Sequence, residues 1–371
     1  MKKLTASLVF AAMFLFLSGS AMAYYTIYDD ATGGDCSSIG IWDAGTKTCT
    51  LTADLYIPSG HGINIGSDYV TLNGNGHVVN GVRNPFYTGV DIYYRTGVTV
   101  KNLRLVNFWH GIVLISSSGN SITGTNNTSN YIGILLGQSN DNIFSNNSLM
   151  SNDHGFRVVE SSNNIFRGNN IANGYMGIST FRSNVTLRDN SISNNIYGFY
   201  YEDSSNQNIV YNNNFIDNQY QTFCAADNFC SNDIFSFAAP TGGNYWSNYN
   251  TPEEGCSDLN NDSFCDVPNG LDYLPWTMQD GWLTPETLIG GTITAVEELL
   301  TSGDIATVGT ATSLTSTLNN ALNAISGGNI QAGGNMLQAF INKVEAQAGK
   351  QISAEAAAQL IDAAEQIMSK L

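Results

Sequence analysis

Three charged residues stand at the same place in a regular glycine pattern, and their types suit acid–base chemistry. Glu160, Arg182 and Asp203 each follow a glycine of that pattern by five residues. If successive repeats stack as neighbouring strands do, Glu160 and Asp203 lie about 9.6 Å apart, at the outer limit for the two carboxyl groups of an inverting glycosidase. Arg182 between them favours the ionised form of both carboxyl groups, which opposes the raised pKa that a general acid needs. We therefore favour a salt-bridged ladder, with a catalytic pair as the alternative.

A second set of polar and aromatic residues follows the same glycines by two or four residues, where the side chains of a strand should face outward. Asp91 and Glu202 are five repeats, or about 24 Å, apart, so they cannot act as an acid–base pair. Arg157 and Glu202 join the catalytic candidates for a lyase, epimerase or hydrolase. The predicted glycan contacts also come from this set and are Asp91, Tyr93, Arg157, Phe181, Tyr200 and Glu202.

Outward positions in two neighbouring repeats hold Val113, Ile115 and Leu135, an apolar patch that either another segment or a partner covers. His110 and His154 directly precede glycines of the pattern. Strict alternation along a strand points that position inward or into a corner, and its other occupants are mostly apolar, so we expect packing rather than catalysis. No cluster of His or Met residues in the sequence indicates a copper site.

The glycine pattern itself predicts the elements that position these residues. Gly89, Gly111, Gly133, Gly155 and Gly177 are equally spaced, and another glycine follows one position short of the next step. Each begins a short strand whose alternate residues are apolar, and two more short strands complete each repeat. Three strands in a repeat of about 22 residues are typical of a β-helix coil. The leucine scaffold of a leucine-rich repeat and the 3.6-residue period of a helical repeat are both missing.

Asparagines occupy equivalent turn positions in successive repeats. The two series are Asn147, Asn169, Asn190 and Asn130, Asn152, Asn195. Stacked amides hydrogen-bond from coil to coil, whereas stacked like charges at that spacing repel each other. Asparagine in place of charged residues at these turn positions explains why only 12% of the residues are charged, about half of the usual share.

These repeats, with their S-x-N-N-I and N-N-x-x-G phrases, resemble the right-handed parallel β-helix repeats of the NosD-like group, also described as carbohydrate-binding and sugar-hydrolase β-helices. The segment DCSSIGIWDAGTKTCTLTADL resembles the N-terminal cap of that group, and GGNYWSNYNTPEEGCSDLNNDSFCDVP resembles its terminal motif. The resemblance covers roughly residues 30–282 and implies an all-β, pectin-lyase-like solenoid. Because the group mixes enzymes, binding proteins and surface proteins, it does not specify an activity.

Residues 1–23 have the pattern of a secretory signal peptide, because Lys2 and Lys3 precede a short apolar stretch and a small-x-small sequence ends at Ala23. We expect no membrane span after cleavage and a secreted, extracellular or cell-surface protein, with the periplasm as an alternative. Six cysteines in an exported chain indicate disulfides. Proximity favours the pairs Cys36–Cys49, Cys224–Cys230 and Cys256–Cys265.

Acidic and amide residues alternate late in the sequence in the manner of a calcium-binding loop. Positions 1, 3, 5 and 9 of an EF-hand-like loop correspond to Asp258, Asn260, Asp262 and Asp266, and Phe264 offers its backbone carbonyl at position 7. A serine replaces the turn glycine and an asparagine the bidentate glutamate, so Asp272 or another segment must complete the shell. We favour a structural Ca²⁺ site, with a solvated acidic loop as the alternative.

After residue 290 the sequence is rich in Ala, Leu, Gln and Glu with a 3.6-residue apolar period, which predicts a small helical bundle. The phrase GGNIQAGGNMLQAFINKVEAQAGKQISAEAAAQLIDAAEQI resembles a helical module at the C-termini of multidomain secreted proteins, which implies an extracellular accessory role and leaves room for a protein partner. The predicted organisation is a signal peptide at 1–23, a capping region at 24–61, β-helix repeats at 62–238, a Cys-rich exit segment expected to bind calcium at 239–284 and the helical module at 285–371.

The charge distribution limits the class of ligand. The formal net charge is −17, which argues against a nucleic-acid-binding protein. Residues 189–342 hold 17 of the 31 acidic residues and no Lys or Arg, whereas the coils before them are mildly basic. We expect a disulfide- and calcium-stabilised β-helix that binds polysaccharide or cell-surface glycan without catalysis. A polysaccharide lyase, epimerase or glycoside hydrolase is one alternative, and a structural surface or adhesion protein is the other.

Overall fold

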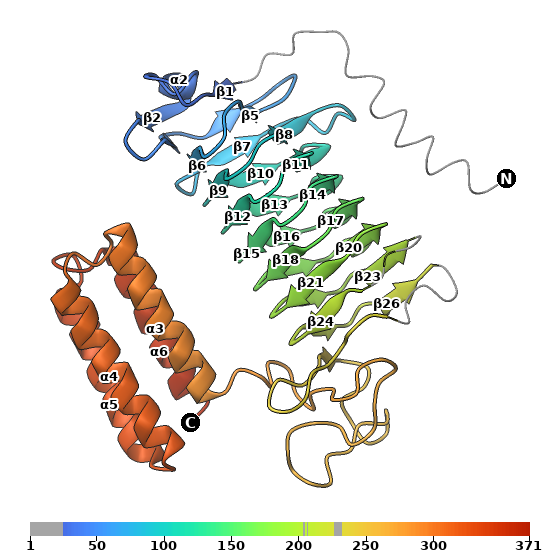
Figure 1. Ribbon diagram of the computed structural model, residues 1–371, viewed down its shortest axis with the longest axis vertical. Helices are drawn as coiled ribbons and strands as arrows, with labels where there is room; N and C mark the ends of the chain where they lie inside the picture. The colour runs from blue at the N-terminus through green and yellow to red at the C-terminus, as the bar shows by residue number, and fades with distance from the viewer. Residues whose placement is uncertain (1–24, 203–204, 206, 226–231) are drawn as a thin grey trace. The chain divides into compact units, whose positions relative to one another are not determined.

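The computed structural model describes residues 25–202, 205, 207–225 and 232–371. The chain divides into two compact units, the first ending at Gln279 and the second spanning Asp280–Leu371. Figure 1 shows the coils of the first unit and the helices of the second. The predicted signal peptide, residues 1–23, lies outside the described residues.

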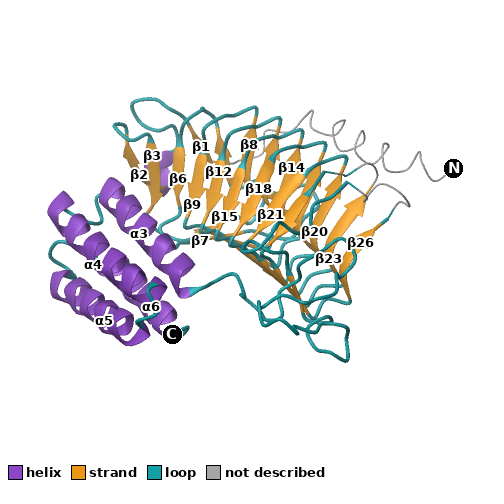
Figure 2. Ribbon diagram, turned by 60° about the horizontal axis from the view of Figure 1, so that its bottom comes forward, coloured by secondary structure: helices purple, strands orange, loops and turns teal. Residues whose placement is uncertain are grey.

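The first unit is a right-handed parallel β-helix, which confirms the fold predicted from the glycine pattern. Among the described residues, the strands form three nine-stranded sheets, seen as stacked rows in Figure 2. Sheet 1 consists of β1 (Tyr25–Ile27), β5 (Ile63–Ile65), β8 (Thr88–Tyr93), β11 (His110–Ile115), β14 (Ile132–Gly137), β17 (His154–Val159), β20 (Met176–Phe181), β23 (Tyr197–Glu202) and β26 (Tyr220–Cys224). Sheet 2 consists of β2 (Gly40–Asp43), β3 (Thr48–Leu51), β6 (Thr71–Asn73), β9 (Thr99–Lys101), β12 (Ser121–Thr123), β15 (Ile143–Ser145), β18 (Asn164–Arg167), β21 (Val185–Arg188) and β24 (Ile209–Tyr211). Sheet 3 consists of β4 (Leu55–Tyr56), β7 (Val78–Asn80), β10 (Arg104–Val106), β13 (Asn126–Thr128), β16 (Ser148–Met150), β19 (Asn170–Ala172), β22 (Ser191–Ser193), β25 (Asn214–Ile216) and β27 (Tyr245–Trp246).

Apolar side chains that alternate with outward ones fill the interior. Ile112 and Leu114 of β11 are fully buried, and the strands on either side place equivalent residues in register with them. Phe144, Phe156 and Phe166 pack together in the middle coils, with the Phe144 and Phe166 rings 4.9 Å apart. Burying each such ring contributes roughly 1.5–3 kcal/mol. Because the apolar columns continue from coil to coil, one core runs through the β-helix.

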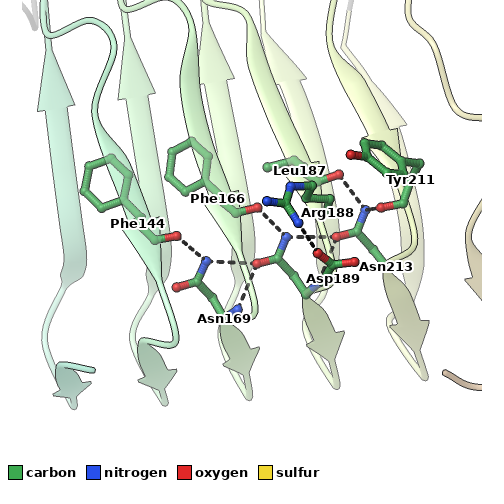
Figure 3. A network of polar contacts seen from close by, with 9 residues as sticks. Phe144, Phe166, Asn169, Leu187, Arg188, Asp189, Tyr211 and Asn213 are labelled. Carbon is green, nitrogen blue, oxygen red and sulfur yellow. Dashed lines mark hydrogen bonds and ion pairs between the residues drawn. The ribbon is translucent and has the colours of Figure 1, made fainter. Parts of the chain in front are cut away.

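Buried asparagines link the coils, as the first predicted series indicates. The side-chain oxygen of Asn169 accepts hydrogen bonds from both the backbone and the side-chain nitrogen of Asn147. Its side-chain nitrogen donates to the Asn190 side-chain oxygen at 2.9 Å and to the Phe144 carbonyl at 3.0 Å (Figure 3). Each of these asparagines therefore accepts from the coil before it, and its side chain donates both to that coil and to the coil after it.

Two of these ladders end at a buried aspartate. The ladder through Asn169 continues by way of Asn213 and Asn244 and ends at Asp272, which accepts from the Asn244 backbone nitrogen at 2.7 Å. A ladder that the sequence analysis missed joins Asn120, Asn142 and Asn164, and in the last coils of the same row Asn208 donates to Asp233. Burial raises the pKa of Asp233 and of Asp272 to about 6. Each of these two rows of amides thus ends at a carboxyl group whose ionised form is destabilised by burial.

The N-terminal end of the β-helix is closed by α2 (Cys36–Ile39) and the antiparallel pair β2–β3, which the Cys36–Cys49 disulfide joins. A second disulfide, Cys256–Cys265, closes a loop after β27. Both pairs match the predicted pairing. Cys224 is also disulfide-bonded, and Cys230, its predicted partner, lies outside the described residues.

The second unit contains the predicted helices. They are α3 (Pro285–Ser302), α4 (Val308–Ser326), α5 (Ile330–Gln347) and α6 (Ala354–Met368). The side-chain oxygen of the residue before each helix accepts a hydrogen bond from a backbone N–H of the first turn. These capping residues are Thr284, Thr307, Asn329 and Ser353 respectively. Leu318, Leu337, Phe340 and Leu360 lie in their shared core. Across the described residues, none of the helices has both the length and the apolar character needed to cross a membrane.

Candidate functional site

The outer face of sheet 1 carries the predicted glycan contacts. The strand register aligns one outward row along the β-helix axis, made of Asp91, Val113, Leu135, Arg157, Ser179, Tyr200 and Phe223. A second outward row, two residues further along each strand, contains Tyr93, Phe181 and Glu202. The face divides into three parts, which differ in exposure and chemistry.

His110 and His154 also lie on this face, so the prediction that their column points inward or into a corner is wrong. A Cβ built on Gly111 would meet interior side chains, which shows that the glycine itself points inward. Ile112 after it is also in the core, so alternation is interrupted at the glycine and His110 turns outward. His154 Nδ1 accordingly lies 3.3 Å from the outward hydroxyl of Ser179. Both imidazoles are nevertheless buried among their neighbours.

The N-terminal part of the face is a buried polar cluster. His61 Nδ1 lies 2.6 Å from Asp91 Oδ2. Asp91 is 3% exposed, and within the described structure neither its Oδ1 nor His110 Nε2 has a hydrogen-bond partner. Burial, with a smaller effect of the His61 charge, lowers the pKa of His110 to about 4, so this imidazole is neutral at physiological pH. Asp91 therefore presents little surface to a ligand.

The middle of the face is apolar and is covered by rings from the same sheet. Its buried members are Val113, Ile132, Leu135 and Val159, which are 2–6% exposed. Tyr93, Tyr131 and Phe181 pack against them. Within the described structure, neighbouring side chains thus cover much of the predicted patch. Tyr93 and Phe181, which were predicted to contact a glycan, contribute to this packing.

An ion pair stands at the start of the C-terminal part. Arg157 Nη1 lies 2.8 Å from Glu202 Oε1, reaching across β20 from β17 to β23. The two side chains are 27% and 23% exposed, so the pair contributes about 1 kcal/mol or less to stability. Burial, and secondly the Glu202 charge, raises the pKa of Tyr200, whose phenol therefore stays protonated and able to donate a hydrogen bond.

Five aromatic side chains continue this part of the face and are called the aromatic strip. They are Tyr175, Tyr197, Tyr200, Tyr220 and Phe223. The Tyr197 ring lies 5.6 Å from Tyr175 and is stacked on Tyr220 at 5.0 Å, while Tyr200 and Phe223 stack at 5.4 Å. Tyr175, Tyr220 and Phe223 are 46%, 42% and 36% exposed. Sequence reasoning selected only Tyr200 from the strip. Tyr197 belongs to the column of His110 and His154, which was predicted to point inward or into a corner. Tyr220 and Phe223 lie in the last coil, which has no glycine at the aligned position.

Glu160 and Arg182 occupy the corner after sheet 1 rather than its face. Both have left-handed backbone, with φ of 47° and 48°. Arg182 Nη1 lies 3.8 Å from Glu160 Oε1, and the Gln138 side chain donates to Glu160 at 3.1 Å. The third member of the predicted ladder, Asp203, lies outside the described residues. For the two described members, the contact is the salt bridge that the sequence favoured.

The predicted calcium loop uses its acidic side chains to bind its own backbone. Asp258 accepts hydrogen bonds from two backbone nitrogens of the loop, and Asp266 accepts one from a third. Asp272, the expected additional ligand, is fully buried and accepts from Asn244 and Trp246, so it does not complete the shell. In the described part of the chain, no group of three or more His, Cys, Asp or Glu side chains is placed to hold a metal ion. The calcium site stays a prediction.

The three-sheet solenoid places this protein in the class of right-handed parallel β-helix repeat proteins. More specifically, the chain belongs to the NosD family, whose profile, described as "Periplasmic copper-binding protein (NosD)", matches residues 45–251. The profile of the FIMAH domain matches residues 289–369, within the helical unit. No curated protein matches this chain.

One solved structure that resembles this chain is the A-module of the mannuronan C-5 epimerase AlgE6 from Azotobacter vinelandii. The two sequences are 15% identical, and the alignment covers 54% of this chain and 78% of the A-module with a TM-score of 0.30. A likeness at this level carries no information about activity.

Proposed function

We propose that this protein is an exported β-helix protein that binds polysaccharide or cell-surface glycan through the aromatic strip. The strip is the observation that carries the proposal, because exposed stacked rings offer flat apolar surfaces on which the C–H faces of sugar rings pack. Arg157, Glu202 and the Tyr200 phenol lie beside these rings and supply hydrogen-bonding groups for sugar hydroxyls. Since the coils repeat at about 4.8 Å, the surface suits a polymer that lies along several coils.

Binding is favoured over catalysis because the acidic side chains near the face are already paired. Glu202 is bonded to Arg157, Glu160 to Arg182, and Asp91 to His61. A glycosidase needs one carboxyl group with a raised pKa and a second one about 5–9.5 Å away. The paired arrangement of the described carboxylates supports a recognition surface.

A second candidate, a polysaccharide lyase or epimerase, is favoured by one observation. His154, Arg157 and Ser179 meet on the face, with the Ser179 hydroxyl 3.3 Å from His154 and 3.5 Å from Arg157. An arginine that holds a uronate carboxylate and a neutral imidazole that removes a proton are the parts such a reaction requires. Burial, and secondly the Arg157 charge, lowers the pKa of His154 to about 4, which makes it a weak base. The appearance of unsaturated ends, abolished by His154→Ala, would favour this candidate over pure binding.

Copper binding, which the family description names, finds no support in the donor groups of the described residues. Among the described residues, no group of three or more His, Cys, Asp or Glu side chains is placed to hold a metal ion. The described cysteines are disulfide-bonded. The disulfides support the proposed export, because they persist in oxidising compartments.

The proposal is tested by titrating purified protein with neutral and acidic polysaccharides in affinity electrophoresis and calorimetry. Tyr197→Ala is expected to weaken binding roughly tenfold or more, since a central aromatic platform is a typical binding hot spot. Tyr56→Ala is the matched control, because Tyr56 is 66% exposed on β4, away from sheet 1. Equal affinities for the two variants would refute the strip as the binding surface.

A further inference from the structure

A cavity of about 470 Å³ opens beside β26, at the C-terminal end of the aromatic strip. Its apolar surface includes Trp246, Phe235 and Tyr201, which are 4–5% exposed and belong to the core of the last coils. The volume lies within the range of about 300–1,000 Å³ that is typical of small-molecule sites. The cavity is therefore large enough for a sugar ring and contains rings on which it can pack.

The polar side chains that line the cavity are amides and hydroxyls rather than charged groups. Gln219, Gln221, Asn248 and Asn269 line it, and none of the described lining residues is charged at neutral pH. Gln221 is held in place by hydrogen bonds from Asn218 and to the Ser247 hydroxyl. An amide both donates and accepts, which matches a sugar hydroxyl that does the same.

The uncharged lining of the cavity disfavours acidic sugars. From residue 189 to the end of the first unit, the sequence contains acidic residues but no Lys or Arg. None of the described residues that line the cavity is a Lys or Arg, so a uronate or sulfate group there would have no lining cation to pair with. A neutral sugar has no such penalty.

Tyr220 connects the cavity with the aromatic strip. It lines the cavity and stacks on Tyr197 at 5.0 Å, and Tyr197 in turn contacts Tyr175. We propose that the cavity receives the terminal sugar of a neutral glycan whose following sugars lie along the strip. The inference rests on the function proposed above and adds the ligand's charge class and the recognition of a chain end. Space left by loose packing at the end of the solenoid would give the same volume without affinity for a sugar.

The experiment compares the double variant Asn248→Ala/Asn269→Ala with the control Asn319→Ala/Asn320→Ala, which removes two exposed amides from α4. Calorimetric titration uses linear neutral oligosaccharides of two to six sugars, and for the best binder the same chain with its terminal sugar oxidised to a carboxylate. We expect the cavity variant to bind the neutral chain about tenfold more weakly than the control. The oxidised chain should lose affinity to a similar extent with unaltered protein.

The outcomes separate the two proposals. If the cavity variant and its control bind the neutral chain equally, or if only acidic glycans bind, the cavity is not a neutral chain-end site, while an effect of Tyr197→Ala would still support glycan binding at the strip. If neither neutral nor acidic glycans bind the unaltered protein, the proposed function itself fails. Equal melting temperatures of the cavity variant and the unaltered protein serve as the check on folding.

Discussion

Replacing Asn169 by leucine removes one member of the asparagine ladder, because leucine has nearly the same shape but no polar atoms. The Asn169 oxygen accepts from the Asn147 backbone nitrogen at 3.0 Å, and its side-chain nitrogen donates to the Phe144 carbonyl at 3.0 Å. Both backbone groups are buried, and both lose this partner in Asn169→Leu. An unsatisfied buried group costs about 1–3 kcal/mol, so the variant should lose about 2–6 kcal/mol of unfolding free energy. This is a large part of the stability of a typical domain, about 5–15 kcal/mol.

The assay is denaturant unfolding of the full chain, with hydrogen exchange of the Asn147 amide as a local measurement. Asn64→Leu is the matched control, since Asn64 lies half-buried on β5 and is not part of a ladder. We expect a change of less than about 1 kcal/mol for the control. If Asn169→Leu costs no more than Asn64→Leu, or if the Asn147 amide keeps its protection, the ladder does not hold the coils together.

Three further predictions concern the ends of the β-helix. Because burial raises the folded-state pKa of Asp272 from 3.8 to about 6, its contribution to stability is present below about pH 4 and is lost as the pH rises through 6. The melting temperature should therefore rise when the pH is lowered from 7 to 5. The rise should be smaller in Asp272→Asn than in Glu253→Gln, a control at an exposed position. Equal pH dependence of the melting temperature in the two variants would contradict the prediction. Calcium should raise the melting temperature and EDTA should reverse the rise, with Asp258→Asn insensitive to both, whereas no response of the unaltered protein would count against the predicted site. Replacing both Cys36 and Cys49 by serine should cost about 3 kcal/mol, estimated from their sequence separation of 13, and reduction of the unaltered protein should produce a similar loss; denaturant unfolding checks both.

The sequence was sufficient for the architecture because the glycines and asparagines mark coils that stack in register. Gly111 and Gly133 predict neighbouring strands β11 and β14, and Asn147 and Asn169 predict a hydrogen bond between coils, all of which the structure contains. Both predictions depend only on equal spacing along the chain. Residues that are equally spaced along the chain stack on one another in the structure wherever the apolar columns of the core are continuous.

The direction of individual side chains was harder to predict. Strict alternation fails at Gly111, whose inward orientation turns His110 outward, and no residue type in the sequence signals this interruption. The aromatic strip was missed for a related reason. Tyr197 and Tyr220 are not separated by the regular interval of the repeat, and only the strand pairing shows that they are neighbours. Site residues thus depend on local departures from the repeat, whereas the fold depends on the repeat itself.

The aspartates at the ends of the ladders bear on how the solenoid avoids growing into a fibre. An asparagine both accepts and donates, so a ladder that ended in asparagine would offer a free donor to a further coil or to a second molecule. An ionised carboxylate only accepts, and Asp272 already receives hydrogen bonds from Asn244 and Trp246. The amide series therefore has no donor left to pass on at this end. The open ends of such a fold are templates for end-to-end assembly. The aspartate that completes the ladder therefore also prevents the ladder from continuing into a further coil or a second molecule.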